Sequence, residues 1–222
     1  MCFSASASFG ISAVLLVGGI ATVKKVNTPT QLPFAVIPII FSIQQFIEGI
    51  LWLSLTNTNN TDWHQPATLI FLIFAQVVWP FWVPFSIYLM EPDPKRKKIL
   101  AAILSIGTLI SFYLAYCIMF YDVNSSISTF HIRYNVNNPT PKYLLNLSAV
   151  LYFIPTVFPT FISSVKKMNI IGITLVTSFA ISKLFFAENV VSVWCFFAAA
   201  ISVVVFYIIA SVVQVQTKFQ NL

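Results

Sequence analysis

The amino-acid sequence predicts an all-α fold, a polytopic membrane bundle of seven transmembrane helices. Of the 222 residues, 58% are hydrophobic and only 8% are charged, whereas soluble domains carry about a quarter charged residues. So few charges could not cover a globule with a solvated surface. The apolar residues also lie in long runs divided by short polar segments, which is typical of a chain that crosses a bilayer several times.

Seven apolar runs approach the roughly 20 residues that a helix needs to span the hydrocarbon core. They cover residues 6–23, 32–55, 66–90, 98–120, 143–165, 169–187 and 190–214. The sixth run is interrupted by Lys183 and closed by Glu188, and a six-span chain would need residues 169–214 to fold differently. The sequence is interpreted as one transmembrane domain, residues 1–222.

The distribution of positive charge predicts the orientation of the chain. Most Lys and Arg residues lie in the loops 24–31, 91–97 and 166–168 and in the C-terminal tail. Cytoplasmic loops carry such an excess, so we expect the N-terminus outside and the C-terminus in the cytoplasm. The net charge of +6 forms no basic stripe of the kind that binds nucleic acid, and the lipid bilayer is the expected partner.

The outer loops are then residues 56–65 and 121–142, both rich in Asn, Ser and Thr. The second is long enough to form a small cap. Two inward-running segments, WPFWVPFSIY at 79–88 and IPTVFPTFIS at 154–163, share a Pro-x-x-x-Pro pattern. This echo indicates either a parallel repeat of the kind found in transporters or two prolines tolerated independently in membrane helices.

Polar side chains form a stripe on the second predicted span. Gln44, Gln45, Glu48 and Trp52 share a helix face because residues three and four apart are neighbours. An ionised carboxylate in the bilayer costs a few kcal/mol, roughly 3 at the helix centre on insertion scales. Glu48 must therefore be protonated, paired or hydrated. Lys183 is its natural ionic partner, unless Lys183 extends to the interface and Glu48 only ties helices together by a hydrogen bond.

The predicted topology brings further polar groups to the depth of Glu48, namely Gln76, Trp79 and Lys183 from three other spans. The inner halves of the spans are largely aliphatic or aromatic. The sequence thus predicts an outward-facing polar pocket lined by Gln44, Gln45, Glu48, Trp52, Gln76, Trp79 and Lys183.

The three cysteines leave several interpretations open. Cys2, Cys117 and Cys195 all fall near the outer end of a span, where two of them could form a disulfide. Alternatively, Cys2 with Glu48, His64 or His131 could bind a borderline metal, although the spacing of these residues matches no metal motif. Buried cysteines also serve simply as small apolar residues. The chain contains no hydrolase, phosphate-loop, zincin or kinase motif, and whether it uses a cofactor is left unknown by its sequence.

The start MCFSASASF and the stretch LPFAVIPIIFSIQQFIEGILWL resemble a group of small, uncharacterised multi-span bacterial membrane proteins. That group shares an MCFSA-type start and a QQxxEGxxW pattern in its second span. The resemblance implies a protein of the bacterial inner membrane and singles out Cys2, Ser4, Gln44, Gln45, Glu48, Gly49 and Trp52. Gly49 would allow close helix approach beside Glu48.

Three functions remain open from the sequence. The first is a membrane protein whose pocket, centred on Glu48, binds a small ligand, ion or proton for sensing or transport. The second is an intramembrane enzyme that uses Cys2 as thiolate or metal ligand and Glu48 as acid/base. The third is a structural subunit of a membrane complex, and an oligomer is compatible with all three.

Overall fold

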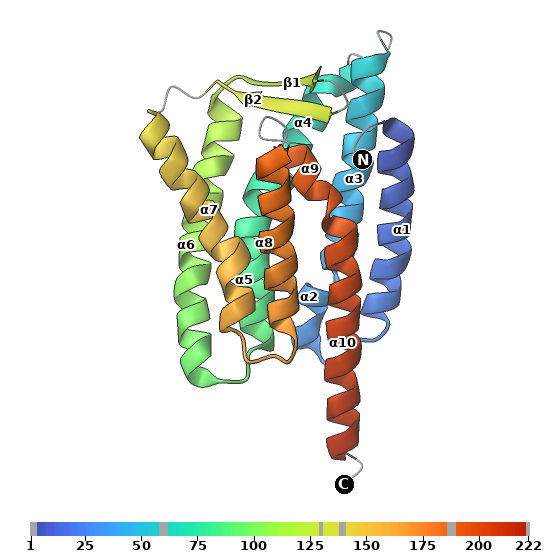
Figure 1. Cartoon of the computed structure of the whole chain (residues 1–222), viewed down its shortest axis with the longest axis vertical. Coiled ribbons are helices and arrows are strands. Elements are labelled where there is room, and N and C mark those ends of the chain that lie inside the picture. The colour runs from blue at the N-terminus through green and yellow to red at the C-terminus, as the bar shows by residue number, and fades with distance from the viewer. Residues whose placement is uncertain (1–3, 58–61, 129–130, 138–140, 186–189, 221–222) are drawn as a thin grey trace.

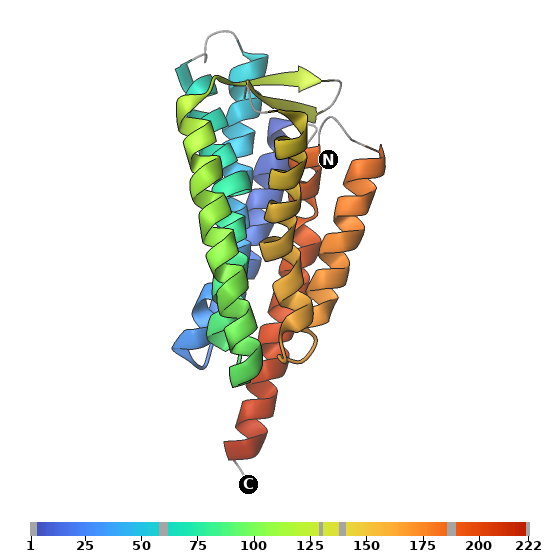
Figure 2. The ribbon, with the colours of Figure 1, turned by 90° about the vertical axis from the view of Figure 1, so that its left-hand side faces the viewer.

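The structure, a computed structural model, describes residues 4–57, 62–128, 131–137, 141–185 and 190–220, apart from the side chains of 142–146, 195, 196, 198, 199 and 213–220. Long helices stand side by side, and a β-hairpin lies across one end of them (Figures 1 and 2). We call this the hairpin end. The opposite end, which carries Lys24–Lys25, Lys95–Lys98 and Lys166–Lys167, is called the basic end.

The described residues are mostly helical. In chain order the elements are α1 (Ala5–Val23), a 3₁₀ turn (Pro29–Gln31), α2 (Leu32–Ala35), α3 (Ile37–Thr56), α4 (His64–Leu72), a π-helical segment (Ile73–Val78), α5 (Trp79–Met90), α6 (Pro94–Phe120), β1 (Val123–Ser128), β2 (His131–Val136), α7 (Lys142–Ile162), α8 (Met168–Phe185), α9 (Val190–Phe196) and α10 (Ala198–Gln220).

Five helical stretches of the described chain are long and apolar enough to cross a membrane. They are Ala5–Val23, Pro29–Thr56, His64–Met90, Pro94–Phe120 and Met168–Phe185. Two shorter apolar stretches, Leu147–Ile162 and Ala200–Val212, follow in α7 and α10. The helices overlap each of the seven predicted apolar runs, and their length and composition are compatible with a multi-pass membrane protein.

Three of the predicted runs are less regular than expected. The second divides at Val36 into α2 and α3, just before Pro38. The third contains the π-helical segment ahead of Pro80. The seventh, expected as one span over 190–214, divides at Phe197 into the short α9 and the long α10. The first two irregularities lie beside prolines, because a proline has no N–H for the helical ladder.

The all-α prediction missed one element, since β1 and β2 form an antiparallel pair, here called the hairpin, in which Val123 pairs with Val136 and Ser128 with His131. Along β2, Ile132, Tyr134 and Val136 alternate with polar residues, a pattern typical of a strand with one buried face. Ile132 is fully buried, and the Tyr134 ring stacks on Phe71 of α4 with centroids 4.7 Å apart. The expected cap is therefore present, but as a sheet.

Close helix packing depends on small residues at two crossings. Between α1 and α3, the hydroxyls of Ser12 and Ser42 each donate to the backbone oxygen of the other at 2.8 Å. Gly49 faces α1 there, and a Cβ atom on it would lie 2.6 Å from the Phe9 ring. The close approach predicted for Gly49 is confirmed.

The second crossing joins α5, α6 and α7. A Cβ atom on Gly107 of α6 would overlap the carbonyl oxygen of Pro80 and lie 2.9 Å from Cβ of Pro155. The two prolines that correspond in the Pro-x-x-x-Pro echo thus pack against the same glycine, while the repeat itself stays a prediction. The largest apolar core lies toward the basic end, where Ile87, Leu100 and Ile208 are fully buried.

Candidate functional site

Glu48 lies on the buried face of α3 and its side chain has no solvent exposure. Its carboxylate accepts a hydrogen bond from Gln45 Nε2 at 3.1 Å on the same helix. The hydroxyl of Ser192, on α9, donates to Glu48 Oε1 at 2.7 Å. A buried carboxylate needs such donors because it has lost its water. Glu48, the one carboxylate of the predicted polar stripe, therefore links α3 to α9.

The neighbouring Gln44 makes a second link, from α3 to α5. Its Oε1 accepts a hydrogen bond from Trp79 Nε1 at 2.9 Å, and the Trp79 ring stacks on Phe41 with centroids 4.0 Å apart. Both Gln44 and Gln45 are fully buried. The period of the helix thus places Gln44 and Gln45 against different partners.

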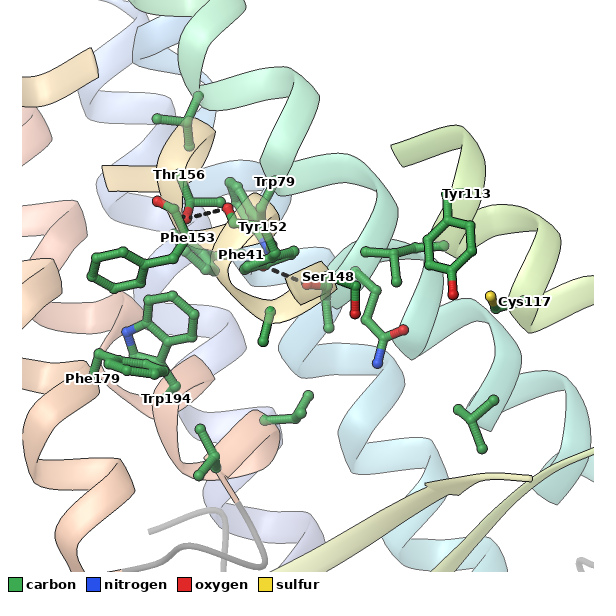
Figure 3. A pocket seen from close by; sticks show the side chains of 18 of the residues that line it. Phe41, Trp79, Tyr113, Cys117, Ser148, Tyr152, Phe153, Thr156, Phe179 and Trp194 are labelled. Atoms are coloured by element: carbon green, nitrogen blue, oxygen red, sulfur yellow. Dashed lines mark hydrogen bonds between the residues drawn. The ribbon is translucent and has the colours of Figure 1, made fainter. Parts of the chain in front are cut away.

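A cavity of about 360 Å³ lies beside this network, toward the hairpin end. Its wall comes from α3, the π-helical segment, α5, α6, β2, α7, α8, α9 and α10. Figure 3 shows Phe153, Phe179 and Trp194 gathered on one side of the cavity and Tyr113 and Cys117 of α6 on the other. The volume lies within the range of about 300–1,000 Å³ that is usual for small-molecule sites.

The short helix α9 separates Glu48 from this cavity. Val190, Val191 and Trp194 line the cavity, whereas Ser192 of the same helix bonds Glu48. Residues two apart lie on different faces of a helix, so α9 presents one face to each. The carboxylate therefore fixes the position of a wall of the cavity without lining it.

Most polar groups of the cavity wall are used by the protein. The Tyr152 hydroxyl donates to the carbonyl of Ala75 at 2.7 Å. In a π-helix a carbonyl accepts from the N–H five residues later. For Ala75 that residue is Pro80, which has no N–H, so Tyr152 supplies the donor. The Trp194 indole donates to the Ser178 hydroxyl at 3.0 Å. These bonds stabilise irregular backbone and aromatic orientation rather than offering donors to a ligand.

The structure brings together only part of the predicted lining. Gln76 and Trp79 line the cavity, whereas Gln44, Gln45 and Glu48 lie behind its wall. Trp52 is buried at the hairpin end of α3 and borders a separate hollow with α1. Lys183 is exposed on α8, and within the described residues no ion pair joins it to Glu48.

The groups of the proposed metal or thiol chemistry lie apart. Cys2 is outside the described residues, as is the side chain of Cys195, and Cys117 is buried on α6. His131 is buried in β2, and this burial lowers its pKa. Among the residues that the structure describes, no group of three or more His, Cys, Asp or Glu side chains could hold a metal ion.

His64 belongs to a closed ring of hydrogen bonds beneath the hairpin. Its Nε2 lies 2.8 Å from the hydroxyl and 3.2 Å from the carbonyl oxygen of Ser125. Since a carbonyl only accepts, Nε2 carries the proton and donates. The hydroxyls of Ser125 and Thr68 lie 2.7 Å apart, and Thr68 donates to the carbonyl of His64. Within the described structure, Ser125 thus occupies this nitrogen of His64.

The comparison with protein families gives one match, which covers residues 1–219 and is described as a family of unknown function, DUF6629. The chain belongs to DUF6629. No curated protein and no solved structure matches it. Membership of an uncharacterised family agrees with the resemblance found in the sequence, and the MCFSA and QQxxEGxxW motifs of that resemblance stay predictions.

Sequence reasoning missed two residues of the site in this DUF6629 chain. Ser192 lies 144 residues from Glu48, and a serine in an apolar run carries no mark of its partner. Tyr152 lies in the fifth apolar run without any sign of its partner, although Pro80 could have signalled a carbonyl in need of a donor.

A second buried carboxylate, Glu91, lies at the basic end and was also missed. It is 2% exposed and accepts hydrogen bonds from the Ser163 hydroxyl and the Ser164 N–H, both at 2.8 Å, and from the Ser164 hydroxyl and the Asp93 N–H. Burial raises the pKa of Glu91, but these hydrogen bonds outweigh it and hold the pKa below its ordinary value. Glu91 thus joins the α5–α6 loop to the α7–α8 loop.

Proposed function

We propose that the protein is a multi-pass protein of the cell membrane that binds a small ligand in the cavity beside α9, for sensing or transport. The chain crosses the bilayer seven times, with its N-terminus outside and its C-terminus in the cytoplasm. The gathering of basic clusters at one end of the bundle supports this orientation. The hairpin then covers the outer end.

The single observation that carries the ligand-binding proposal is the cavity. Helical interiors are close-packed and leave few voids larger than a water molecule, yet this one measures about 360 Å³. Its described lining contains no Asp, Glu, Lys, Arg or His. An ion or a charged ligand would pay a large desolvation cost there, so an uncharged ligand is favoured over the ion or proton that the sequence left open.

Glu48 then acts as a positioning residue rather than as the ligand-binding centre. Its bond to Ser192 holds α9, and Val191 and Trp194 of that helix face the cavity. A ligand that displaces Trp194 must move α9 against this bond, or exchange the bond for another. Binding of a ligand in the cavity would therefore be transmitted to α3 through the Glu48–Ser192 bond. Such a coupling suits a sensor and a transporter equally.

The test is the mass of what co-purifies. Three forms of the detergent-purified protein are compared by native mass spectrometry: wild type, Ala149→Trp and Val150→Trp. Ala149 is an exposed residue of the cavity wall on α7, so a tryptophan there is designed to obstruct the cavity. Val150 is the next residue, 56% exposed and outside the cavity, and so gives a matched control. We expect a discrete bound mass in wild type and Val150→Trp that is absent in Ala149→Trp. A mass retained in Ala149→Trp, or no bound mass in any form, would overturn the proposal.

A further inference from the structure

The aromatic side of the cavity favours a flat apolar body. The rings of Phe179 and Trp194 meet edge to face with centroids 5.1 Å apart. The ring centroid of Phe153 lies 5.2 Å from that of Phe179. All three line the cavity from different helices and point into the same region (Figure 3). Aromatic rings attract further rings in offset or edge-to-face contact, so this side suits a ring or a conjugated chain.

The opposite side offers hydrogen bonds that the protein does not use. Gln76 and Tyr113 line the cavity, and within the described structure neither side chain makes a hydrogen bond to a protein atom. By contrast, four other side chains of the wall donate hydrogen bonds to protein acceptors, namely Trp79, Tyr152, Thr156 and Trp194. At membrane depth water is scarce and a free amide or hydroxyl is costly. An oxygen on the ligand would satisfy both groups.

The mouth of the cavity lies at the side of the bundle. Among its described lining residues only Tyr113 of α6 and Ala149 of α7 are exposed. These two helices touch at Gly107 and Pro155 and diverge toward the hairpin end (Figures 1 and 2). The flanking surface of α6 is apolar, with Phe112 71% and Leu109 70% exposed. In a membrane, such a mouth opens to the acyl chains rather than to water.

We infer that the cavity takes an uncharged lipophilic molecule from the bilayer, one whose ring body lies between Phe153, Phe179 and Trp194 and whose carbonyl or hydroxyl group meets Gln76 and Tyr113. This inference rests on the proposed ligand-binding function and specifies its ligand class. The Gln76 amide both donates and accepts, as does the Tyr113 hydroxyl, so either a ketone or an alcohol oxygen is accommodated. The described part of the wall carries no charged side chain, so it favours an uncharged group over a carboxylate or an amine.

The test compares two probes of nearly the same shape, 2,3-dimethyl-1,4-naphthoquinone and 2,3-dimethylnaphthalene, which lacks the carbonyl groups. The two methyl groups leave the quinone no free ring carbon to which the Cys117 thiol of the cavity wall could add. Binding of each is measured by equilibrium dialysis against the purified protein in detergent, with empty micelles as the blank. The proteins are wild type, the double variant Gln76→Leu/Tyr113→Phe, and Ala149→Trp, with Val150→Trp as the matched control. Thermal melting of each variant shows that it is folded.

We expect saturable binding of the quinone to wild type and Val150→Trp, roughly tenfold or more tighter than that of the hydrocarbon, since one hydrogen bond in a dry site is worth about that factor. The double variant should bind both probes equally, and Ala149→Trp should bind neither. Equal binding of both probes to wild type, quinone binding unchanged in the double variant, or no saturable binding of either probe would overturn the ligand class. The co-purified mass tests the cavity as a site independently of these outcomes.

Discussion

Replacing Glu91 by glutamine should destabilise the protein at its basic end. Each oxygen of the Glu91 carboxylate faces one backbone N–H, since Oε1 accepts from Asp93 and Oε2 from Ser164. A hydroxyl can rotate to accept, but a backbone N–H cannot. Whichever oxygen becomes the amide NH₂, one partly buried N–H therefore loses its acceptor and meets a donor instead.

The magnitude follows from these bonds. A buried donor left without a partner costs about 1–3 kcal/mol, and hydrogen bonds to a charged group, about 1.5–3 kcal/mol each, weaken when the group becomes neutral. We expect a total loss of about 3 kcal/mol. In a chain of 222 residues, about 1 kcal/mol shifts the melting temperature by roughly 2–4 °C. The expected drop is roughly 6–12 °C.

The same group gives the wild-type protein a pH dependence of known sign. Because the folded pKa of Glu91 lies below its ordinary value of 4.5, folding favours the carboxylate. Its contribution to stability is complete above pH 4.5 and is lost as the pH falls through the folded pKa. Glu91→Gln has no proton to bind there, so we expect its stability to fall less than that of wild type over this interval.

The assay is thermal unfolding in detergent, followed by tryptophan fluorescence at neutral pH and at pH values down to the acid limit of the detergent-solubilised protein. Asp93→Asn is the matched control, because it removes one charge from the same loop while asparagine still caps α6 as Asp93 does. That control should change stability by less than about 0.5 kcal/mol. A Glu91→Gln protein as stable as wild type, or one with the same acid sensitivity, would refute the reasoning.

Three further outcomes are expected. Gly107→Ala should lower the melting temperature strongly because its Cβ overlaps Pro80, whereas Gly18→Ala, which meets nothing within 4 Å, should raise stability by up to about 1 kcal/mol; equal effects would contradict the packing. Tyr152→Phe should cost about 1–3 kcal/mol in thermal unfolding by leaving the Ala75 carbonyl without its donor, and an unchanged melt would argue against that bond. The orientation is tested in a variant in which all three natural cysteines are replaced by serine. A membrane-impermeant maleimide added to intact cells should label Asn124→Cys and not Lys98→Cys. The reverse labelling would show that the proposed orientation is wrong.

The helices were predictable from the sequence because the hydropathy of an apolar run depends only on residues that are neighbours in the chain. A segment in lipid must satisfy its own backbone groups, and a helix does so without any partner. For the same reason, the stripe of Gln44, Gln45 and Glu48 followed from the helical period alone. The pairing of β1 with β2 was missed because its buried face depends on Phe71 and other residues of α4.

The site was only partly predictable. Gln76 and Trp79 line the cavity, and the sequence placed both near the depth of Glu48 because chain direction and residue number fix depth in a bundle; their part in ligand binding stays a prediction. The assignment of Glu48 to the lining did not anticipate α9, which lies between the carboxylate and the cavity. No sequence signal marks a helix break at Phe197, since neither glycine nor proline occurs there.

The sequence by itself determined the helical, membrane-compatible class of this DUF6629 protein, the place of Glu48 on a buried helix face and the end of the bundle that carries the basic clusters. The tertiary structure alone decided which groups Glu48 and Glu91 meet. Ser192 reaches Glu48 and Ser163 reaches Glu91 from segments 144 and 72 residues away. It also decided where a cavity remains, because an unfilled volume depends on how far apart α6 and α7 stand, and that distance is set by Gly107 against two prolines of neighbouring helices.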